Sequence, residues 1–255
     1  MEISHDYEVL VCGENTPSMF DYGEIIANLS SKLAKMTKII VGYDWNCGKA
    51  NVDMPFYGRS VLETSLTAIL ARIDPFRLIL VYKVQSDPDY DIGKRAQSAV
   101  EWSGDIIAKD PPRANLWMYD KKKETFDRAL LGNYMGEIIW KPAFRALSEY
   151  AAGLEYDSIW LMDVVSESEN SNFEKAKSIA AKLFSSFSKG VHSEYLVNIE
   201  AVLDVDTLKS LLKDMYKLCA TLALASHFID FLATKIDRDR ALTIFFGIEE
   251  MIRNV

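Results

Sequence analysis

Two polar clusters interrupt an otherwise apolar, helical pattern and carry the residue types that could do chemistry. Arg59 and Glu63 lie one helical turn apart. Much later, residues 188–194 bring His192 and Glu194 together with a lysine and two serines. An imidazole can act as a general acid or base, and an arginine can stabilise negative charge developing on a phosphate. With Glu63 or Glu194 orienting the imidazole, this set suits acid–base chemistry on a substrate that carries a phosphate.

Each cluster also has a purely structural interpretation. Arg59 and Glu63 fit an ion pair on a helix surface, although Arg before Glu is the weaker orientation. His192 follows Gly190, a helix terminator, so the helix dipole favours its imidazolium form and the ring could simply cap the helix end together with Glu194. An Arg on a mainly apolar helix needs an acceptor. We therefore expect Arg59 and Glu63 to lie close to His192 or Glu194, in one buried or semi-buried network between two helices.

Helices must position these clusters, because apolar residues recur at helical spacing in most long segments. Asp53 is a candidate cap with Pro55 in the first turn of its helix, and Pro142 predicts a kink. Residues 1–15 fit a short strand or a frayed helix, and Phe76–Val84 fits a helix or a strand, with helix favoured because Pro75 repeats the Asp-then-Pro opening. The segments with a helical pattern are 18–42, 56–73, 93–108, 126–154, 172–190, 206–235 and 239–253.

Most motifs of catalysis and cofactor binding are missing from the sequence. It lacks GxxxxGK, GxGxxG after a strand, HExxH, GxSxG and an EF-hand loop. Its three cysteines have no CxxC spacing, and its 3 histidines leave little for a metal. His227 and Asp230 could share a helix face, most simply as a satisfied polar pair. We therefore expect neither a cofactor nor a metal site.

Composition restricts the partners and the compartment. The 255 residues hold 29 Lys and Arg against 37 Asp and Glu, a net charge of −8 that does not support general nucleic-acid binding. Lys121–Lys123 is the one basic run, so nucleic acid stays possible but unsupported by charge. The longest apolar stretch, Leu218–Ala233, is too short to span a bilayer. Unpaired cysteines and a start unlike a signal peptide indicate a cytoplasmic protein without a membrane partner.

A helix bearing Arg59-x-x-x-Glu63 followed by one ending in Ser188-Lys189-Gly190-Val191-His192 resembles the HEPN-like helical families, over residues 55–195. These families include abortive-infection-related proteins of bacterial defence loci. In their catalytic members, an Arg, four to six residues and a His on one helix form a ribonuclease site. Here no arginine precedes His192 at that spacing, and Lys189 is not a substitute. The resemblance thus implies a bundle of four or more helices and puts RNA cleavage in doubt.

The sequence therefore predicts an all-α, HEPN-like helical bundle, with an N-terminal strand as its one possible β-element, in a single domain over residues 1–255. The leading hypothesis is a non-catalytic interaction module that binds a protein partner or forms a homo-oligomer, as an accessory subunit of an anti-phage defence or toxin system. The alternative is a divergent ribonuclease that uses His192. Aromatic residues are abundant, and five are candidate interface anchors: Trp102, Trp117, Tyr119, Trp140 and Trp160. The predicted core is Leu62, Leu66, Ile69, Leu183, Phe184, Leu211, Leu222 and Phe228.

Overall fold

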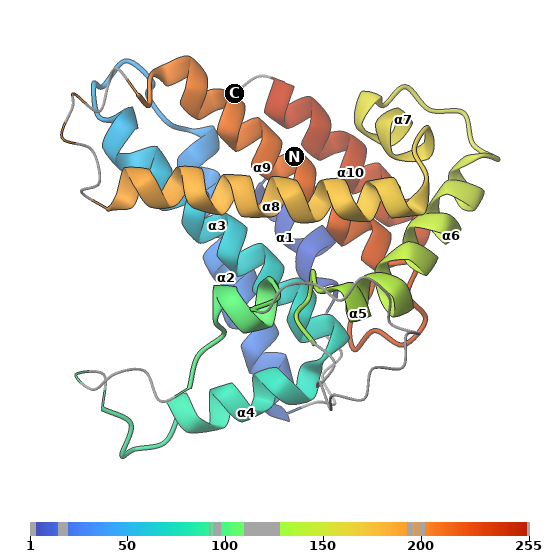
Figure 1. Ribbon diagram of the computed structural model, residues 1–255, viewed down its shortest axis with the longest axis horizontal. Helices are drawn as coiled ribbons and strands as arrows, with labels where there is room; N and C mark the ends of the chain where they lie inside the picture. Colours follow the sequence, from blue (N-terminus) through green and yellow to red (C-terminus); the bar gives the residue numbers. More distant parts are fainter. Residues whose placement is uncertain are drawn as a thin grey trace, which may run out of the picture.

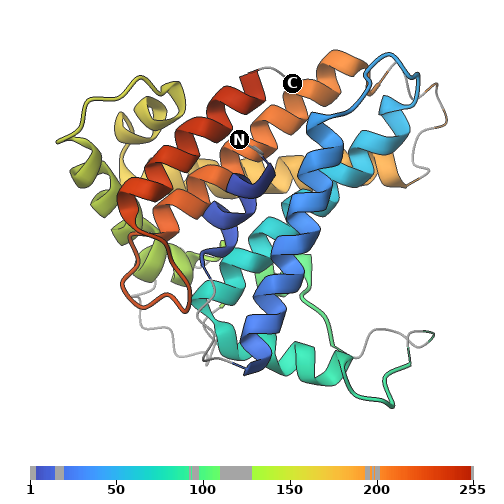
Figure 2. The ribbon, with the colours of Figure 1, turned by 180° about the vertical axis from the view of Figure 1, so that it is seen from behind.

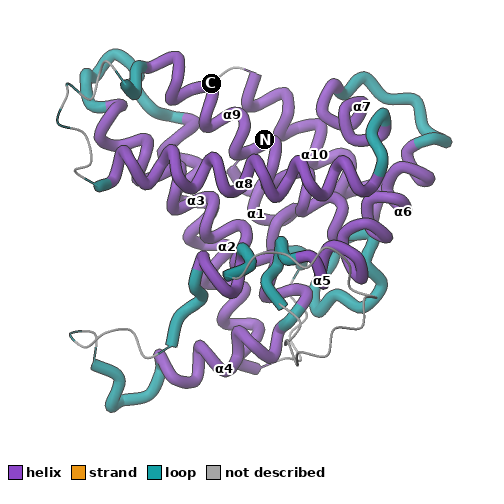
Figure 3. Tube along the Cα trace, in the orientation of Figure 1, coloured by secondary structure: helices purple, strands orange, loops and turns teal. Residues whose placement is uncertain are grey.

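The computed structural model describes residues 4–14, 20–91, 93, 98–109, 128–192, 196, 198 and 202–253. These residues form α-helices and two π-helical turns and contain no strand, so the described part of the chain is all-α (Figure 3). The elements are α1 (Ser4–Cys12), α2 (Phe20–Val41), α3 (Ala50–Ile73), α4 (Pro75–Gln85), η1 (Trp102–Ile106), α5 (Asn133–Met135), η2 (Gly136–Trp140), α6 (Lys141–Ala151), α7 (Ile159–Val165), α8 (Glu169–Val191), α9 (Val205–Ser226) and α10 (Arg238–Arg253).

Two helices, α3 and α9, form the centre of the bundle. α3 packs against α2, α8 and α9, and α9 also packs against α10 and α1. Both helices bury residues on nearly every side, as expected for helices that are surrounded by others. Seen from behind, α2 runs along one side of the bundle and α1 lies between α2 and α10 (Figure 2).

The front of the bundle is crossed by α8, which spans α3 and α9 (Figure 1). A glycine permits the close crossing with α3. A Cβ atom at Gly58 would lie 2.5 Å from the ring of Phe187, so a larger residue would push the helices apart. The crossing places Arg59, the next residue of α3, against the C-terminal third of α8.

The short helix α7 is anchored by a buried carboxylate from α10. Glu249 is only 3% exposed. Its Oε2 accepts a hydrogen bond from Ser158 Oγ at 2.6 Å, and its Oε1 accepts one from the backbone N–H of Ile159 at 3.1 Å. A carboxylate at a helix N-terminus satisfies N–H groups that have no partner within the helix. This contact fixes the N-terminal end of α7 against α10.

Several sequence-based predictions are confirmed and others are wrong. Phe76–Val84 is helical, as α4, and seven of the eight predicted core residues are buried, whereas Phe184 is half-buried. The strand considered for the N-terminal residues is wrong over residues 4–12, because this segment forms α1 and packs among α2, α3, α9 and α10. The helix predicted to begin at Phe56 begins at Ala50. Asp53 does not cap it and accepts a hydrogen bond from Tyr43 instead.

Two predicted helices are shortened by tertiary contacts. Residues 98–109 contain only the π-helical turn η1, in which Gly104 has φ 116°. There Asp105 accepts hydrogen bonds from Arg77 and from the backbone of Glu101, and these contacts replace a continuous helix. The helix predicted over residues 206–235 ends at Ser226. None of the described helices is long and apolar enough to cross a membrane.

Candidate functional site

The structure brings Arg59, Glu63 and His192 together where α3 meets the end of α8. Arg59 Nε donates a hydrogen bond to Glu63 Oε1 at 3.2 Å, and Arg59 Nη1 lies 3.3 Å from His192 Nε2. The predicted contact between Arg59 and His192 is therefore present. Glu194 lies outside the residues that the structure describes. Within the described residues, Glu63 contacts Arg59 and does not contact the imidazole of His192.

Two aromatic rings complete the surroundings of the guanidinium. Arg59 Cζ lies 4.6 Å from the centroid of the Phe184 ring, a cation–π arrangement. Trp102 of η1 stacks on Phe184 with centroids 4.0 Å apart and an interplanar angle of 8°. This stack covers one face of the Phe184 ring and ties η1 to α8.

The network is half-buried at Arg59 and Glu63, within the expected range, and exposed at His192. The side chain of Arg59 is 23% exposed and that of Glu63 is 41% exposed, and His192 is exposed. His192 stands at the end of α8, as predicted, and its backbone N–H donates to Ser188 O at 2.9 Å. Gly190 does not terminate this helix. It lies within α8 and packs closely against Pro55.

The contact with Arg59 decides what His192 can do. A guanidinium only donates hydrogen bonds, so His192 Nε2 can only be the acceptor in this contact. Glu63 balances the charge of Arg59. The arrangement thus offers one imidazole, one neutralised cation and aromatic surface. A phosphate group could bind to Arg59 only by competing with the carboxylate of Glu63.

A second polar cluster, which sequence reasoning missed, lies in the core. Arg72 of α3 is 0% exposed. Its Nε donates to Thr234 O at 2.9 Å, and its Nη1 donates to Val11 O at 3.1 Å and to Ser226 Oγ at 2.8 Å. Its Nη2 lies 3.1 Å from His227 Nδ1. We call Arg72, Ser226, His227 and Thr234 the Arg72 cluster.

The Arg72 cluster caps the C-terminal end of α1. A helix leaves its last carbonyls without partners inside the helix. Here the carbonyl of Leu10 accepts from His227 Nε2 at 2.9 Å, and that of Cys12 accepts from Thr234 Oγ1 at 2.7 Å. Arg72 binds the carbonyl between them. The buried positive charge therefore sits at the ends of α1 and α9, where the helix dipoles favour a cation.

Burial shifts the protonation of this cluster. It lowers the pKa of Arg72 to about 10, so the guanidinium stays charged near neutral pH. Burial, reinforced by the charge of Arg72, lowers the pKa of His227 to about 3. The imidazole is thus neutral, with its hydrogen on Nε2 and with Nδ1 accepting from Arg72 and from the backbone of Ile236. Burial also raises the pKa of the Cys12 thiol to about 12.

The remaining candidates from the sequence are dispersed. His227 does not pair with Asp230, which is exposed and faces Arg238 instead. Trp140 is fully buried and donates to Leu130 O, and Trp102 and Trp160 are half-buried. Trp117, Tyr119 and Lys121–Lys123 lie outside the described residues. Among the described residues, no three His, Cys, Asp or Glu side chains gather in a way that could hold a metal ion.

Comparisons of this chain with protein-family models, with curated proteins and with solved structures find no match.

Proposed function

We propose that this protein is a non-catalytic helical interaction module that pairs with a second copy of itself through the outer face of α4. One observation carries the proposal. Phe76, Leu80 and Val84 form an apolar ridge on α4 and are 68%, 52% and 39% exposed. Their spacing of four residues places them on one helix face. Leu78, on the opposite face, is 4% exposed and holds α4 to the bundle.

The position of α4 leaves this ridge accessible. α4 packs against α2 and α3 and lies at the edge of the molecule, away from α8, α9 and α10 (Figure 1). Burial of a Phe, Leu or Val side chain contributes about 1.5–3 kcal/mol each, so covering the ridge is favourable. Contiguous exposed apolar surface of this kind is typical of interaction sites.

A second copy suits the ridge because of its register and its charges. In an antiparallel pair centred on Leu80, Phe76 of one copy meets Val84 of the other, as a two-fold interface requires. Asp87 and Asp89 follow the C-terminal end of α4. Arg128, whose side chain is 69% exposed, lies at the N-terminal end beside Asp74. The antiparallel arrangement brings these opposite charges together at both ends.

Self-association tests this proposal. We expect light scattering after size exclusion, at about 100 µM protein, to give a mass near twice the 28.9 kDa of the monomer. Leu80→Glu should weaken the dimer at least about tenfold, because it places two carboxylates at the centre of the interface. Met162→Glu, at a similarly exposed apolar position on α7, is the matched control and should leave the dimer intact. A monomeric wild type, or equal effects of both variants, would contradict the proposal.

The role of such a dimer as an accessory subunit in an anti-phage defence or toxin system, in the cytoplasm, is part of the same proposal. It draws on the resemblance to HEPN-like families in Arg59, Glu63 and the 188–192 segment. The contact between Arg59 and His192 supports it only as a polar link between two helices, since this contact also has the simple structural role of fixing α3 against α8.

The second candidate is a divergent ribonuclease, and the exposed Arg59–His192 contact is the observation that favours it. We expect that, if the protein cleaves RNA in the presence of EDTA, His192→Ala lowers the rate at least about a hundredfold, as loss of a general acid or base does. Lys189→Ala, one turn earlier on α8, is the control. Equal cleavage by wild type and His192→Ala would end this candidate.

A further inference from the structure

A groove of about 430 Å³ opens at the N-terminal end of α4, next to the apolar ridge of that helix. Asp74, which caps α4, lines the groove together with Arg128. The other walls are mainly apolar and include Met135, Ile138 and Phe231. Ile138 is 46% exposed and Phe231 is 63% exposed, so part of this apolar surface faces solvent.

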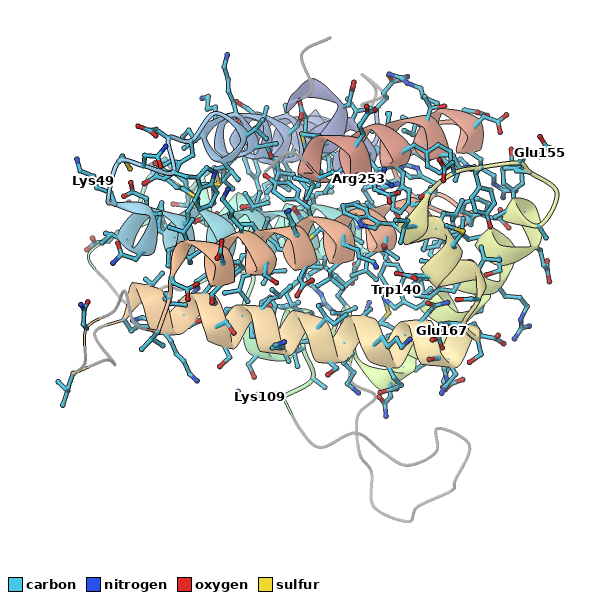
Figure 4. The ribbon with its side chains drawn as sticks, turned by 90° about the horizontal axis from the view of Figure 1, so that it is seen from above. Lys49, Lys109, Trp140, Glu155, Glu167 and Arg253 are labelled. Atoms are coloured by element: carbon cyan, nitrogen blue, oxygen red, sulfur yellow. The ribbon has the colours of Figure 1, made fainter. Side chains whose placement is uncertain are left out.

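The wall formed by η2 is held firmly to the core. Trp140, the last residue of η2, is fully buried and is labelled inside the bundle in Figure 4. Its Nε1 donates a hydrogen bond to Leu130 O at 2.7 Å. This bond ties η2 to the short segment that carries Arg128, so the groove has a fixed shape before anything binds to it.

The antiparallel pairing of α4 determines what reaches this groove. When two copies pair about Leu80, residue 76 of one lies level with residue 84 of the other, as a two-fold axis requires. By the same register, residues 73 and 74 lie level with residues 87 and 86 of the second copy. The turn that follows α4 in one copy therefore reaches the groove at the beginning of α4 in the other.

This turn is already ordered in the single chain. The backbone N–H of Asp89 donates to Asp87 Oδ1 at 2.9 Å, and that of Tyr90 donates to Asp87 O at 2.9 Å. Pro88 lies between the two aspartates, and all three side chains are exposed. A turn that is ordered before it binds loses little conformational entropy on binding.

The charges of the turn and of the groove are complementary. Arg128 Nη2 donates to Asp74 Oδ2 at 3.2 Å, which is the one contact of this guanidinium with a described side chain. A guanidinium has five N–H donors, so Arg128 can accommodate a second carboxylate. A small apolar tip between two carboxylates thus matches an apolar groove that has an arginine at its edge.

We propose that the groove receives the turn of residues 86–90 from the second copy. Pro88 packs against Ile138 and Phe231, and Asp89 pairs with Arg128. This inference rests on the proposed pairing through α4. It adds a second contact surface, which occurs twice in the two-fold dimer and fixes the register of the two α4 helices.

The dimer dissociation constant, measured by sedimentation velocity, tests the apolar part of this contact. Ile138→Glu should weaken the dimer at least about fivefold, because it places a charge where Pro88 packs. Met162→Glu is the matched control, since Met162 is also 46% exposed but lies on α7. It should leave the dissociation constant unchanged.

Charge reversal tests the ionic part. Arg128→Glu and Asp89→Arg should each weaken the dimer about threefold or more, because each places like charges together at both ends of the interface. The two changes combined in one chain should restore the dissociation constant to within about twofold of the wild type. Both residues are exposed, so these variants test the contact even if Ile138→Glu does not fold.

The outcomes separate this inference from the pairing through α4. A dimer that Leu80→Glu disrupts, but that neither Ile138→Glu nor the charge reversals weaken, overturns the groove contact alone. The same conclusion follows if the combined variant is no tighter than either single charge reversal. A monomeric wild type overturns the pairing through α4 and the groove contact with it.

Discussion

Replacement of Arg72 by Met should destabilise the protein by about 3–5 kcal/mol. The variant keeps most of the buried side-chain volume but removes every donor of the guanidinium. The carbonyls of Val11 and Thr234 and the hydroxyl of Ser226 then lose buried hydrogen bonds. Each buried polar group left without a partner costs about 1–3 kcal/mol. Urea denaturation followed by far-UV circular dichroism measures the free energy of unfolding.

Arg145→Met is the matched control for this experiment. Arg145 forms an ion pair with Glu169, and its side chain is 60% exposed. An exposed ion pair of this kind contributes about 0–1 kcal/mol, so the control should unfold nearly as the wild type does. If Arg72→Met loses less than about 1 kcal/mol, the Arg72 cluster does not hold α1 against α3 and α9.

The positions of Arg59 and Arg72 show how far sequence reasoning reaches. An arginine on an apolar helix was expected to need an acceptor, and that argument correctly joined Arg59 to His192. The same argument applies with more force to Arg72, which follows Ile69, Leu70 and Ala71. The acceptors of Arg72 include backbone carbonyls of α1 and of Thr234. A sequence pattern shows which side chains are polar, but it does not show which backbone carbonyls lack a partner. The buried cluster was therefore missed.

Helical periodicity predicted the long helices well and their ends poorly. In α9 the apolar pattern continues to Ala233, so the sequence alone predicted a longer helix. The chain leaves the helix at Ser226, which lets His227 reach the carbonyl of Leu10. In the same way, the helical pattern that ends at Ala108 predicted a helix where the described residues form η1, in which Asp105 accepts a hydrogen bond from Arg77. Hydrogen bonds to distant parts of the chain determine where both helical segments end. The local spacing of apolar residues carries no information about such contacts.

The exposed apolar ridge of α4 also escaped sequence reasoning. Phe76, Leu80 and Val84 have the spacing of a core stripe, and nothing in the sequence distinguishes a stripe that faces the core from one that faces solvent. The residues proposed as interface anchors were instead tryptophans and a tyrosine elsewhere in the chain. Trp140 is instead in the core, where its Nε1 donates to Leu130 O at 2.7 Å.

His227 should make the protein less stable as the pH falls below neutral. Its pKa is about 3 in the folded protein and about 6.5 in an unfolded chain. Above pH 6.5 neither state binds the proton, so this residue gives no pH dependence there. Between pH 6.5 and pH 3 the unfolded state binds one more proton, and the free energy of unfolding falls as the pH falls. The loss is about 2 kcal/mol at pH 5 and about 4 kcal/mol at pH 3.

Urea denaturation at a series of pH values from 8 to 5 measures this loss before most carboxylates of the unfolded chain begin to titrate. His227→Gln should abolish the decline, because its amide can donate to Leu10 O and accept from Arg72 without titrating. The comparison uses the slope with pH, so a constant loss of stability in the variant does not affect it. His192→Gln leaves the Arg72 cluster intact and should keep the wild-type decline. A wild type equally stable at pH 8 and pH 5, or a His227→Gln variant with an unchanged slope, would show that His227 is not buried as a neutral acceptor of the Arg72 guanidinium.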